Sequence, residues 1–417
     1  MTKEVTVVGG GAIGLATAYY LAQAGAAVQV IEARRTGSGA SWGNSGWIAP
    51  SFAGPVPAKG LVSYTMKSLL DPASPIYFAL RADRDFVRWS WKFWRHCNDG
   101  AFQRGMHATA KLGESTHALY SELTARGIDF GIQRAGILMV ALNAASLEGD
   151  LDRLRVLSAY GYPLPDAVLT GDELHEAEPF LSDDVAAGFV IEGEAHVDPA
   201  RIAGGFADGL VQVGGEILEG TEVIGIDHRN GRVTALHSSS GRLEVDDLVL
   251  AAGAWTEPLA RMLGVKLLMQ AGKGYSFSVR PRIQPLRPIH FGESKVVVTP
   301  FSDGKVRVSG TMELSGLNLN LDRRRLRAIQ VGARKYMAEW PDGTVDDEWV
   351  GMRPLAADGL PILGRLPGFE NVYLATGHSM SGITLAPATG FFLSELIMTG
   401  QAADLLKPFA PERITRR

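Results

Sequence analysis

Residues 4–32 read EVTVVGGGAIGLATAYYLAQAGAAVQVIE, and this stretch decides how the fold of the chain begins. Its apolar pattern predicts a short buried strand over residues 4–8, an alanine-rich helix over residues 12–25 and a second strand over residues 28–32. A strand, a helix and a strand within about thirty residues form a βαβ unit, whose right-handed crossover starts a parallel sheet. The sequence therefore predicts an α/β domain at the N-terminus.

The glycines of this stretch follow a known pattern. Gly9, Gly11 and Gly14 give G-x-G-x-x-G between the first strand and the helix, where bare backbone lets a pyrophosphate approach the helix N-terminus. Glu32 ends the next strand, where a carboxylate can bind the ribose hydroxyls of an adenosine. Together they favour a dinucleotide site over a glycine-rich turn without a ligand. Because the same fingerprint serves NAD and FAD, other segments must decide between them.

Length and charge limit the remaining classes of protein. With 417 residues the chain is too long for one ordinary core, so we expect two or so compact units. Acidic side chains outnumber basic ones by 45 to 41, and no lysine-arginine tract runs through the middle of the chain. Such a surface does not attract a polyanion, so nucleic acid is not an expected partner.

Cysteine usage and hydropathy bear on the compartment. Cys97 is the lone cysteine, which leaves no internal disulfide and too few thiolates for a structural zinc or iron–sulfur site. We accordingly predict no metal site and a cytoplasmic location. The N-terminus shows no signal-peptide pattern, and no uncharged apolar stretch reaches eighteen residues. The sequence predicts at most peripheral membrane contact, at the inner face.

The middle of the chain begins with a loop and an aromatic-rich helical region. Residues 37–60 are crowded with glycine, serine, proline and asparagine and predict a long loop, whereas residues 61–130 look helical. Four aromatic residues there stand beside three basic ones: Trp89, Trp91, Phe93 and Trp94 with Arg88, Lys92 and Arg95. They predict a tryptophan-rich core helix, with a membrane- or quinone-contacting surface as the alternative.

Further along, strand patterns dominate. Turn-bounded β patterns predict a second, mostly antiparallel sheet with strands at residues 137–141, 189–191, 275–279, 295–300 and 306–310. A helix is expected over residues 198–213, a buried strand over 246–251 and a closing helix over 385–399. The return to a buried strand indicates that the N-terminal domain resumes after an insertion.

Three segments favour FAD. Residues 38–46 follow the ribose strand and offer hydroxyl and amide donors for the pyrophosphate and ring of a flavin, although a flexible loop is the alternative. Residues 249–255 form a buried strand that ends in small residues, as needed where a backbone packs against a dinucleotide. Residues 371–383 predict a strand, a glycine turn and a helix start, whose N-terminus would stabilise negative charge on a reduced flavin.

Taken together, these motifs resemble the FAD-dependent D-amino-acid dehydrogenase and glycine oxidase family, within the D-amino-acid oxidase superfamily. Besides the glycine fingerprint with Glu32, the resemblance rests on Ala-Gly-Ala-Trp at 252–255, Lys-Gly-Tyr at 273–275, Gly-Met-Arg-Pro at 351–354 and Thr-Gly-His at 376–378, and it spans essentially the whole chain. It implies a Rossmann-like FAD domain assembled from residues 1–60, 197–262 and 345–417. It further implies a substrate domain, residues 61–196 and 263–344, whose mixed, largely antiparallel sheet covers the flavin ring.

The resemblance also implies three candidate catalytic residues. The arginine of the family's Gly-x-Arg-Pro motif holds the substrate carboxylate, and it matches Arg353, whose planar fork suits a carboxylate. A surface arginine near a turn is the alternative. Tyr275 is expected to accompany the carboxylate or line the flavin, unless it only packs. His378 is expected to contact the ring or the substrate amine, unless it is structural.

The cofactor contacts follow from the same motifs. Residues expected to bind FAD are Gly9, Gly11, Ala12, Ile13, Gly14, Glu32, Ala33, Ser41, Asn44, Ser45, Gly46, Val223, Ala252, Gly253, Trp255, Gly351, Gly377, His378, Gly382, Ile383 and Thr384. FAD should be noncovalent, because Gly43 stands where some relatives carry a flavin-linking histidine and Cys97 lies in an unrelated helix. Arg307 loosely matches the lysine that related oxidases place over the flavin, which favours a dehydrogenase.

The implied reaction is oxidative deamination of a small amino acid, with a D-amino acid as the first expectation. Hydride passes from the α-carbon to flavin N5, and the resulting imine is hydrolysed to a 2-oxo acid and ammonia. Glycine, sarcosine, D-hydroxyproline and opine-type secondary amines share the carboxylate and the amine and remain open. So do an FAD subunit of a multi-component dehydrogenase and, on the fingerprint alone, an NAD-dependent dehydrogenase. A quinone, another respiratory carrier or oxygen is the expected electron acceptor.

Overall fold

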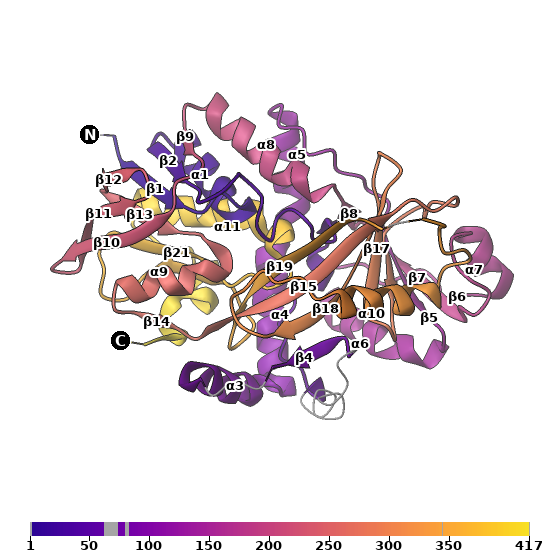
Figure 1. Ribbon diagram of the computed structural model, residues 1–417. Coiled ribbons are helices and arrows are strands. Elements are labelled where there is room, and N and C mark those ends of the chain that lie inside the picture. The colour runs from indigo at the N-terminus through magenta and orange to yellow at the C-terminus, as the bar shows by residue number, and fades with distance from the viewer. Residues whose placement is uncertain (1, 62–73, 80–82, 344, 417) are drawn as a thin grey trace.

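The computed structural model describes residues 2–61, 74–79, 83–343 and 345–416. Two large sheets lie next to each other, and both chain termini lie on the side of the six-stranded one (Figure 1). That sheet has the order β20-β21-β13-β1-β2-β9 and is parallel except for the β20–β21 pair. Its strands are β1 (Glu4–Val8), β2 (Ala27–Ile31), β9 (Glu216–Leu218), β13 (Asp247–Leu250), β20 (Ile362–Arg365) and β21 (Val372–Thr376). The predicted parallel α/β sheet is thus confirmed.

Alternate residues of these strands face two different layers. Val7, Val249 and Tyr373 pack under helices α1 (Ala12–Gln23), α8 (Pro199–Gln212) and α11 (Gly382–Thr399). Val8 and Leu250 face the opposite layer, made by helix α9 (Thr256–Met262) and a three-stranded sheet. The strands of that small sheet are β10 (Val223–Arg229), β11 (Arg232–Ser238) and β12 (Gly241–Glu244). Because both faces are covered, the strands are apolar at successive positions, as buried parallel strands are.

Helix α11 is a core helix. Its eighteen residues are long and apolar enough to cross a membrane by length and composition alone, with Glu395 as their charged residue, but 67% of that window is buried inside the protein. It packs against α1 so closely that a Cβ on Gly390 would lie 2.6 Å from the carbonyl oxygen of Ala16. Burial of this kind is what a helix in the interior of a soluble core requires.

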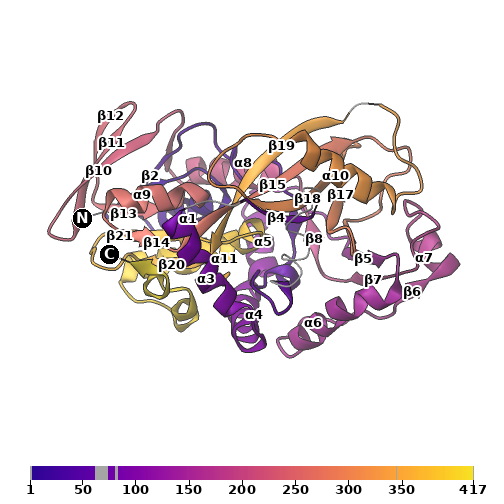
Figure 2. The same ribbon diagram turned by 60° about the horizontal axis from the view of Figure 1, so that its bottom comes forward.

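The second sheet is nine-stranded, with the order β19-β15-β18-β17-β16-β5-β7-β6 and β4 paired to β18. Its pairs are antiparallel except β16–β5 and β18–β4, which confirms a mixed, largely antiparallel sheet. Helix α10 (Arg323–Arg334) covers one face of it (Figure 2). The strands are β4 (Ile76–Phe78), β5 (Ile137–Ala141), β6 (Leu169–Thr170), β7 (Ala187–Ile191), β15 (Met269–Val279), β16 (Ile289–Phe291), β17 (Val296–Pro300), β18 (Val306–Leu314) and β19 (Asp346–Ala356).

The predicted helical region 61–130 is confirmed in part. Helices α3 (Arg84–His96), α4 (Asp99–Gly113) and α5 (Thr116–Ala125) lie within it, whereas residues 62–73 and 80–82 lie outside the described residues. Residues 76–78 form a strand, so the helical prediction was wrong there. They pair with the end of β18, a long-range partner that local sequence cannot reveal.

Helix α3 divides the aromatic cluster between two environments. Trp89 and Phe93 are buried, and the indole of Trp89 donates to the carbonyl of Leu355 at 3.0 Å. Trp91 and Trp94, by contrast, are 56% and 58% exposed, and Arg95 lies over the ring of Trp91. The helix is therefore amphipathic. The predicted core face is confirmed, and contact of the exposed face with a membrane or a quinone stays a prediction.

Short elements complete the described chain. They are strands β3 (Trp47–Ile48), β8 (Ala195–His196), β14 (Lys266–Leu267) and β22 (Thr415–Arg416), helices α6 (Glu148–Ser158) and α7 (Gly171–Ala177), and 3₁₀ helices η1 (Pro50–Phe52), η2 (Ala144–Leu147), η3 (Gly253–Trp255), η4 (Asp404–Phe409) and η5 (Pro411–Arg413). Two of them, β3 and η1, lie in the predicted long loop 37–60.

Strand membership largely follows the predicted division of the chain. The six-stranded sheet draws its strands from the three segments assigned to the first domain. Strand β19 differs, because it lies after residue 345 and nevertheless pairs with β15 in the nine-stranded sheet. The domain boundaries themselves stay a prediction.

Candidate active site

A cavity of about 1320 Å³ lies where the two sheets meet. It is lined by the carboxyl ends of β1, β13 and β21 from one side and by β15, β18 and β19 from the other. The carboxyl edge of a parallel sheet is where ligands bind in folds of this kind. Ordinary small-ligand pockets measure about 300–1,000 Å³, so this cavity has room for a dinucleotide and a small second molecule.

The glycine turn forms one end of the cavity. Gly9 has φ +118°, and a Cβ there would lie 2.5 Å from the carbonyl oxygen of Ala251, so this position requires glycine. A Cβ on Gly14 would lie 2.0 Å from the carbonyl oxygen of Gly9, which explains why helix α1 carries glycine where it packs on the turn. Bare backbone at the N-terminus of α1 leaves space and N–H groups for a pyrophosphate.

Glu32 is fixed beside this turn. Its Oε2 accepts from the backbone N–H of Gly10 at 2.8 Å, and its Oε1 accepts from that of Arg34 at 2.9 Å. Both bonds hold the carboxylate at the end of β2, at the rim of the cavity. A carboxylate oxygen has more than one lone pair, so Glu32 keeps acceptor capacity for ribose hydroxyls.

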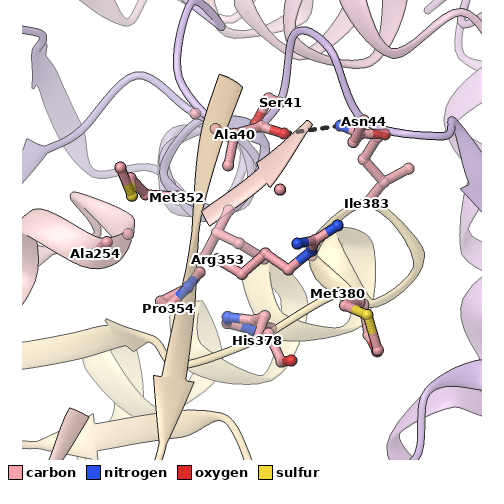
Figure 3. Close-up of a pocket in the computed structure, with 18 of the residues that line it drawn as sticks. Ala40, Ser41, Asn44, Ala254, Met352, Arg353, Pro354, His378, Met380 and Ile383 are labelled. Atoms are coloured by element: carbon pink, nitrogen blue, oxygen red, sulfur yellow. Dashed lines mark hydrogen bonds between the residues drawn. The ribbon is translucent and has the colours of Figure 1, made fainter. Parts of the chain in front are cut away.

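The loop of residues 38–46 lies along the cavity wall. The hydroxyl of Ser41 accepts from the N–H of Ala12 at 3.0 Å, and the amide of Asn44 donates to the carbonyl of Ala40 at 2.9 Å (Figure 3). Ser45 meets Ser309 of β18 with their hydroxyls 2.9 Å apart. These bonds order the loop against helix α1 and the nine-stranded sheet, and the flexible-loop alternative does not describe it.

Trp349 is a cavity residue that the sequence did not single out. A Cβ on Gly43 would lie 2.2 Å from its ring, and one on Gly351 would lie 1.9 Å from it. The indole therefore covers two glycines that the resemblance placed near the flavin. A histidine at position 43 has no room in this arrangement, which agrees with the expected noncovalent cofactor.

Arg353 reaches the cavity from β19. Its Nη1 donates to the carbonyl of Thr311 at 3.0 Å, and within the described residues it forms no ion pair with a carboxylate. Burial lowers the pKa of Arg353 to about 10, so the guanidinium stays charged near neutral pH. In Figure 3 the guanidinium extends toward the side of the cavity where Met380 and Ile383 lie. A partly buried, charged guanidinium without a carboxylate partner is a site for an anionic ligand.

Thr311, whose carbonyl accepts the hydrogen bond from Arg353, has an unusual backbone conformation. Its φ is +56°, and the pairing of β18 with β15 shifts register between Lys273 and Tyr275, directly opposite. Such a bulge re-aims a carbonyl or side chain and is common next to active sites. The Thr311 hydroxyl is buried without a hydrogen-bond partner among the residues described, and it lines the same cavity as Arg353.

His378 lies below Arg353 in the turn between β21 and α11 (Figure 3). Its Nε2 is 2.9 Å from the hydroxyl of Thr389, while its Nδ1 is buried with no partner in the described part of the chain. Burial lowers the pKa of His378 to about 3, so the ring is neutral at physiological pH. A neutral imidazole with one free nitrogen can exchange a hydrogen bond with a ligand in the cavity.

Tyr275 belongs mainly to the other face of β15. It contributes to the cavity lining, but its hydroxyl donates to Glu313 at 2.8 Å, and its ring lies in the buried cluster under α10. Burial, and then the hydrogen bond to Glu313, raise the pKa of Tyr275 above its ordinary value. The structure does not bring this hydroxyl to Arg353, so the packing interpretation fits it better than a catalytic one.

The remaining predicted cofactor residues are brought together, apart from Gly14 and Gly377. Every other position named for FAD lines the cavity. The Thr384 hydroxyl is already used, because it donates to the carbonyl of Trp47 and accepts from the N–H of Ala49, both at 3.0 Å. Arg307 does not line the cavity; it is buried and donates to Ser276 at 3.2 Å.

Comparisons with known proteins agree with this geometry. A model of the FAD dependent oxidoreductase family matches residues 4–396. The chain is 28% identical over 404 residues to a D-amino acid dehydrogenase of Helicobacter pylori and 31% identical over 417 residues to one of Methylobacterium nodulans, with 96% of both chains covered each time. The solved structure of glycine oxidase from Bacillus cereus has a similar fold, with a TM-score of 0.75 at 24% identity over 100% of this chain and 99% of that one.

Proposed function

The chain belongs to the FAD-dependent oxidoreductase family, and on that premise we propose that it oxidises a D-amino acid to the 2-oxo acid and ammonia. The observation that carries the proposal is Arg353, a partly buried guanidinium that faces the cavity without a carboxylate partner among the described residues. An amino acid supplies the missing anion through its α-carboxylate.

The residues present fit FAD. The glycine turn and the N-terminus of α1 would hold the pyrophosphate, Glu32 the ribose, and the loop 38–46 with Gly351 the ring end. Each of these positions offers either bare backbone or a hydrogen-bonding group on the cavity wall. When bound, FAD supplies a two-electron acceptor for the hydride that leaves the substrate.

Arg353 orients the substrate in this account. A bidentate contact to the α-carboxylate fixes the α-carbon in one orientation within the cavity. The α-C–H bond breaks with loss of hydride, the amine loses a proton to water, and a C=N bond forms. Water then adds to the imine and releases ammonia, so the atoms and electrons balance.

His378 is assigned a hydrogen-bonding role. Its unpartnered Nδ1 faces a buried environment beside Arg353, where it can meet the substrate amine. A pKa near 3 makes it a poor proton acceptor near neutral pH, which argues against general-base catalysis.

Support for the D configuration comes from the curated relatives, both named D-amino acid dehydrogenase. Glycine, sarcosine and secondary amines remain competing substrates that the experiments below separate. We further propose a noncovalent cofactor, a cytoplasmic site of action with at most peripheral membrane contact, and a quinone, another respiratory carrier or oxygen as acceptor. The room that Trp349 takes above Gly43 supports noncovalent binding.

Substitution of Arg353 tests the proposal. Arg353→Ala should retain bound flavin and raise the KM for carboxylate substrates by a factor of at least about 100, because each of the two charge-assisted hydrogen bonds that it loses contributes roughly 1.5–3 kcal/mol. Arg353→Lys keeps the charge but not the bidentate geometry, so it should also retain flavin and raise the KM by a smaller factor. Flavin absorbance and steady-state kinetics measure both effects. An unchanged KM would remove Arg353 from the substrate site.

A further inference from the structure

The cavity has a second cationic end, away from the glycine turn. Arg153 of α6 and Lys295, which precedes β17, both line it, together with His290 of β16. The backbone carbonyl of Lys295 packs against Gly310: a Cβ on Gly310 would lie 3.5 Å from the oxygen of that carbonyl. Gly310 adjoins Thr311, whose carbonyl accepts the hydrogen bond from Arg353. The second cationic end is therefore continuous with the wall that holds Arg353.

Arg153 lacks the hydrogen bonds that a buried guanidinium needs. Its side chain is 23% exposed, but its Nε and Nη2 atoms are fully buried without a hydrogen-bond partner among the described residues. Asp150 is the nearest carboxylate, and its Oδ1 stays 3.6 Å from Nη2, beyond hydrogen-bond distance. The guanidinium lies 4.4 Å from the centre of the Phe52 ring. These two donors lack an acceptor, which a ligand or an ordered water in the cavity can supply.

Other carboxylates near this end already have hydrogen-bond or ion-pair partners. Glu194 accepts from the N–H of Ser51 at 3.0 Å and meets His117 at 3.2 Å, so its oxygens are engaged. Asp152 pairs with Arg155 at 2.6 Å.

Arg153 and Lys295 lie near three carboxylates, those of Asp150, Glu194 and Glu293. His290 adds no charge, because burial and then Lys295 lower its pKa to about 4. Net charge therefore does not favour an anion here, and the support for one is the unpartnered Nε and Nη2 donors of Arg153.

We propose that Arg153 and Lys295 form a second anion subsite that binds a distal carboxylate of the substrate. The inference rests on the proposed function, because it takes Arg353 as the holder of the α-carboxylate. The substrate class is then an amino dicarboxylate, with the second carboxylate on the side chain or on an N-substituent. In a largely apolar cavity, two separated guanidinium groups select a molecule that carries two anions over one that carries one.

Matched acids and amides test the proposal. The holoenzyme is reduced anaerobically with D-aspartate against D-asparagine, D-glutamate against D-glutamine, and D-2-aminoadipate for the longer span. N-carboxymethyl-D-alanine covers the N-substituted case, with its amide, N-carbamoylmethyl-D-alanine, as the neutral match. Each pair differs mainly in the distal charge, so the ratio of the two second-order rate constants for flavin reduction reports the subsite. We expect at least one acid to exceed its neutral match at least about tenfold.

Variants then assign that preference to residues. Arg153→Met and Lys295→Met should each reduce the acid-to-neutral ratio at least about tenfold, and Arg153→Lys should restore part of it. Arg282→Met is the matched control, because Arg282 is 79% exposed and should leave the ratio unchanged. Flavin content and near-ultraviolet circular dichroism verify folding of each variant.

Three results would overturn the subsite. They are a wild-type ratio near one for every pair, a ratio that Arg153→Met and Lys295→Met leave unchanged, and loss of FAD from the Arg153 variants, which would assign that residue to the cofactor. If neutral D-amino acids reduce the flavin and the acids do not, the subsite fails while the proposed function stands. If no amino acid of either class reduces it, the proposed function fails and the subsite with it.

Discussion

The guanidinium of Arg353 lies directly over Gly274, on the neighbouring strand: a Cβ at Gly274 would stand 2.3 Å from Nη1. Strands β15 and β19 pair Gly272 with Arg353 and Gly274 with Gly351. The bare backbone of β15 therefore gives the arginine side chain its place in the cavity. A glycine in a strand interior is otherwise unfavourable, and close approach of another group is a recognised reason for it.

Gly274→Ala should displace Arg353. The added methyl cannot share the space of the guanidinium, so the KM for the substrate should rise at least about tenfold, equal to about 1.4 kcal/mol, with flavin content near that of the wild type. Gly204→Ala on helix α8 is the matched control, because a Cβ there meets nothing within 4 Å. Equal kinetics for the two variants would show that Arg353 does not need this position.

The substitution Tyr275→Phe distinguishes a packing role of the Tyr275 side chain from a catalytic one. The hydroxyl donates to Glu313, which also lies 3.5 Å from Lys273 and 3.6 Å from Arg325. Removing one donor from a buried carboxylate should cost about 1–3 kcal/mol of unfolding free energy and leave kcat and KM near the wild-type values. Denaturant unfolding and kinetics on the same preparation measure both. A fall in kcat of more than about tenfold, without loss of flavin, would return Tyr275 to the catalytic residues.

The pH dependence of stability reports on His378. Its folded pKa of about 3 lies below the unfolded value of about 6.5, so as the pH falls through this window the unfolded chain binds a proton that the folded chain does not. The stabilising contribution is present above about pH 6.5 and declines at up to about 1.4 kcal/mol per pH unit below it. His378→Gln should flatten the curve of unfolding free energy between pH 7 and pH 5, whereas the exposed His228→Gln should not. Parallel curves for wild type and His378→Gln would contradict the burial argument.

The sequence predicted the parts of the fold that local pattern determines. The βαβ unit, the strands at residues 137–141 and 306–310 and the helix at 198–213 all carry periodic apolar patterns, and they appear within a few residues of their predicted bounds. The strand at 76–78 was not predicted, because its stability comes from pairing with β18, more than two hundred residues away.

Site residues could be predicted where a sequence motif fixes the local backbone. They could not be predicted where contacts between distant segments place the residue. Gly9, Glu32 and Arg353 stand in motifs whose spacing carries physical meaning, and all three line the cavity. Thr311 owes its place to a bulge, which leaves no signature in the sequence. Trp349 lies two residues before the first glycine of the Gly-Met-Arg-Pro motif, and that proximity was the available signal. The role of Tyr275 stays a prediction, because a strand alternates its faces and the glycines at 272 and 274 within β15 carry no side chain to show which face is which.

The most direct test of the account is anaerobic bleaching of the flavin band of the purified holoenzyme by a panel of D- and L-amino acids, glycine, sarcosine, D-hydroxyproline and an opine. The account predicts that D-amino acids bleach the band, that their L enantiomers do so much more slowly, and that Arg353→Ala bleaches poorly with every carboxylate substrate. Readmitting air then separates an oxidase, which regains its colour quickly, from a dehydrogenase. If the protein is yellow but no member of the panel bleaches it, the FAD site stands and the proposed oxidation of an amino acid is contradicted.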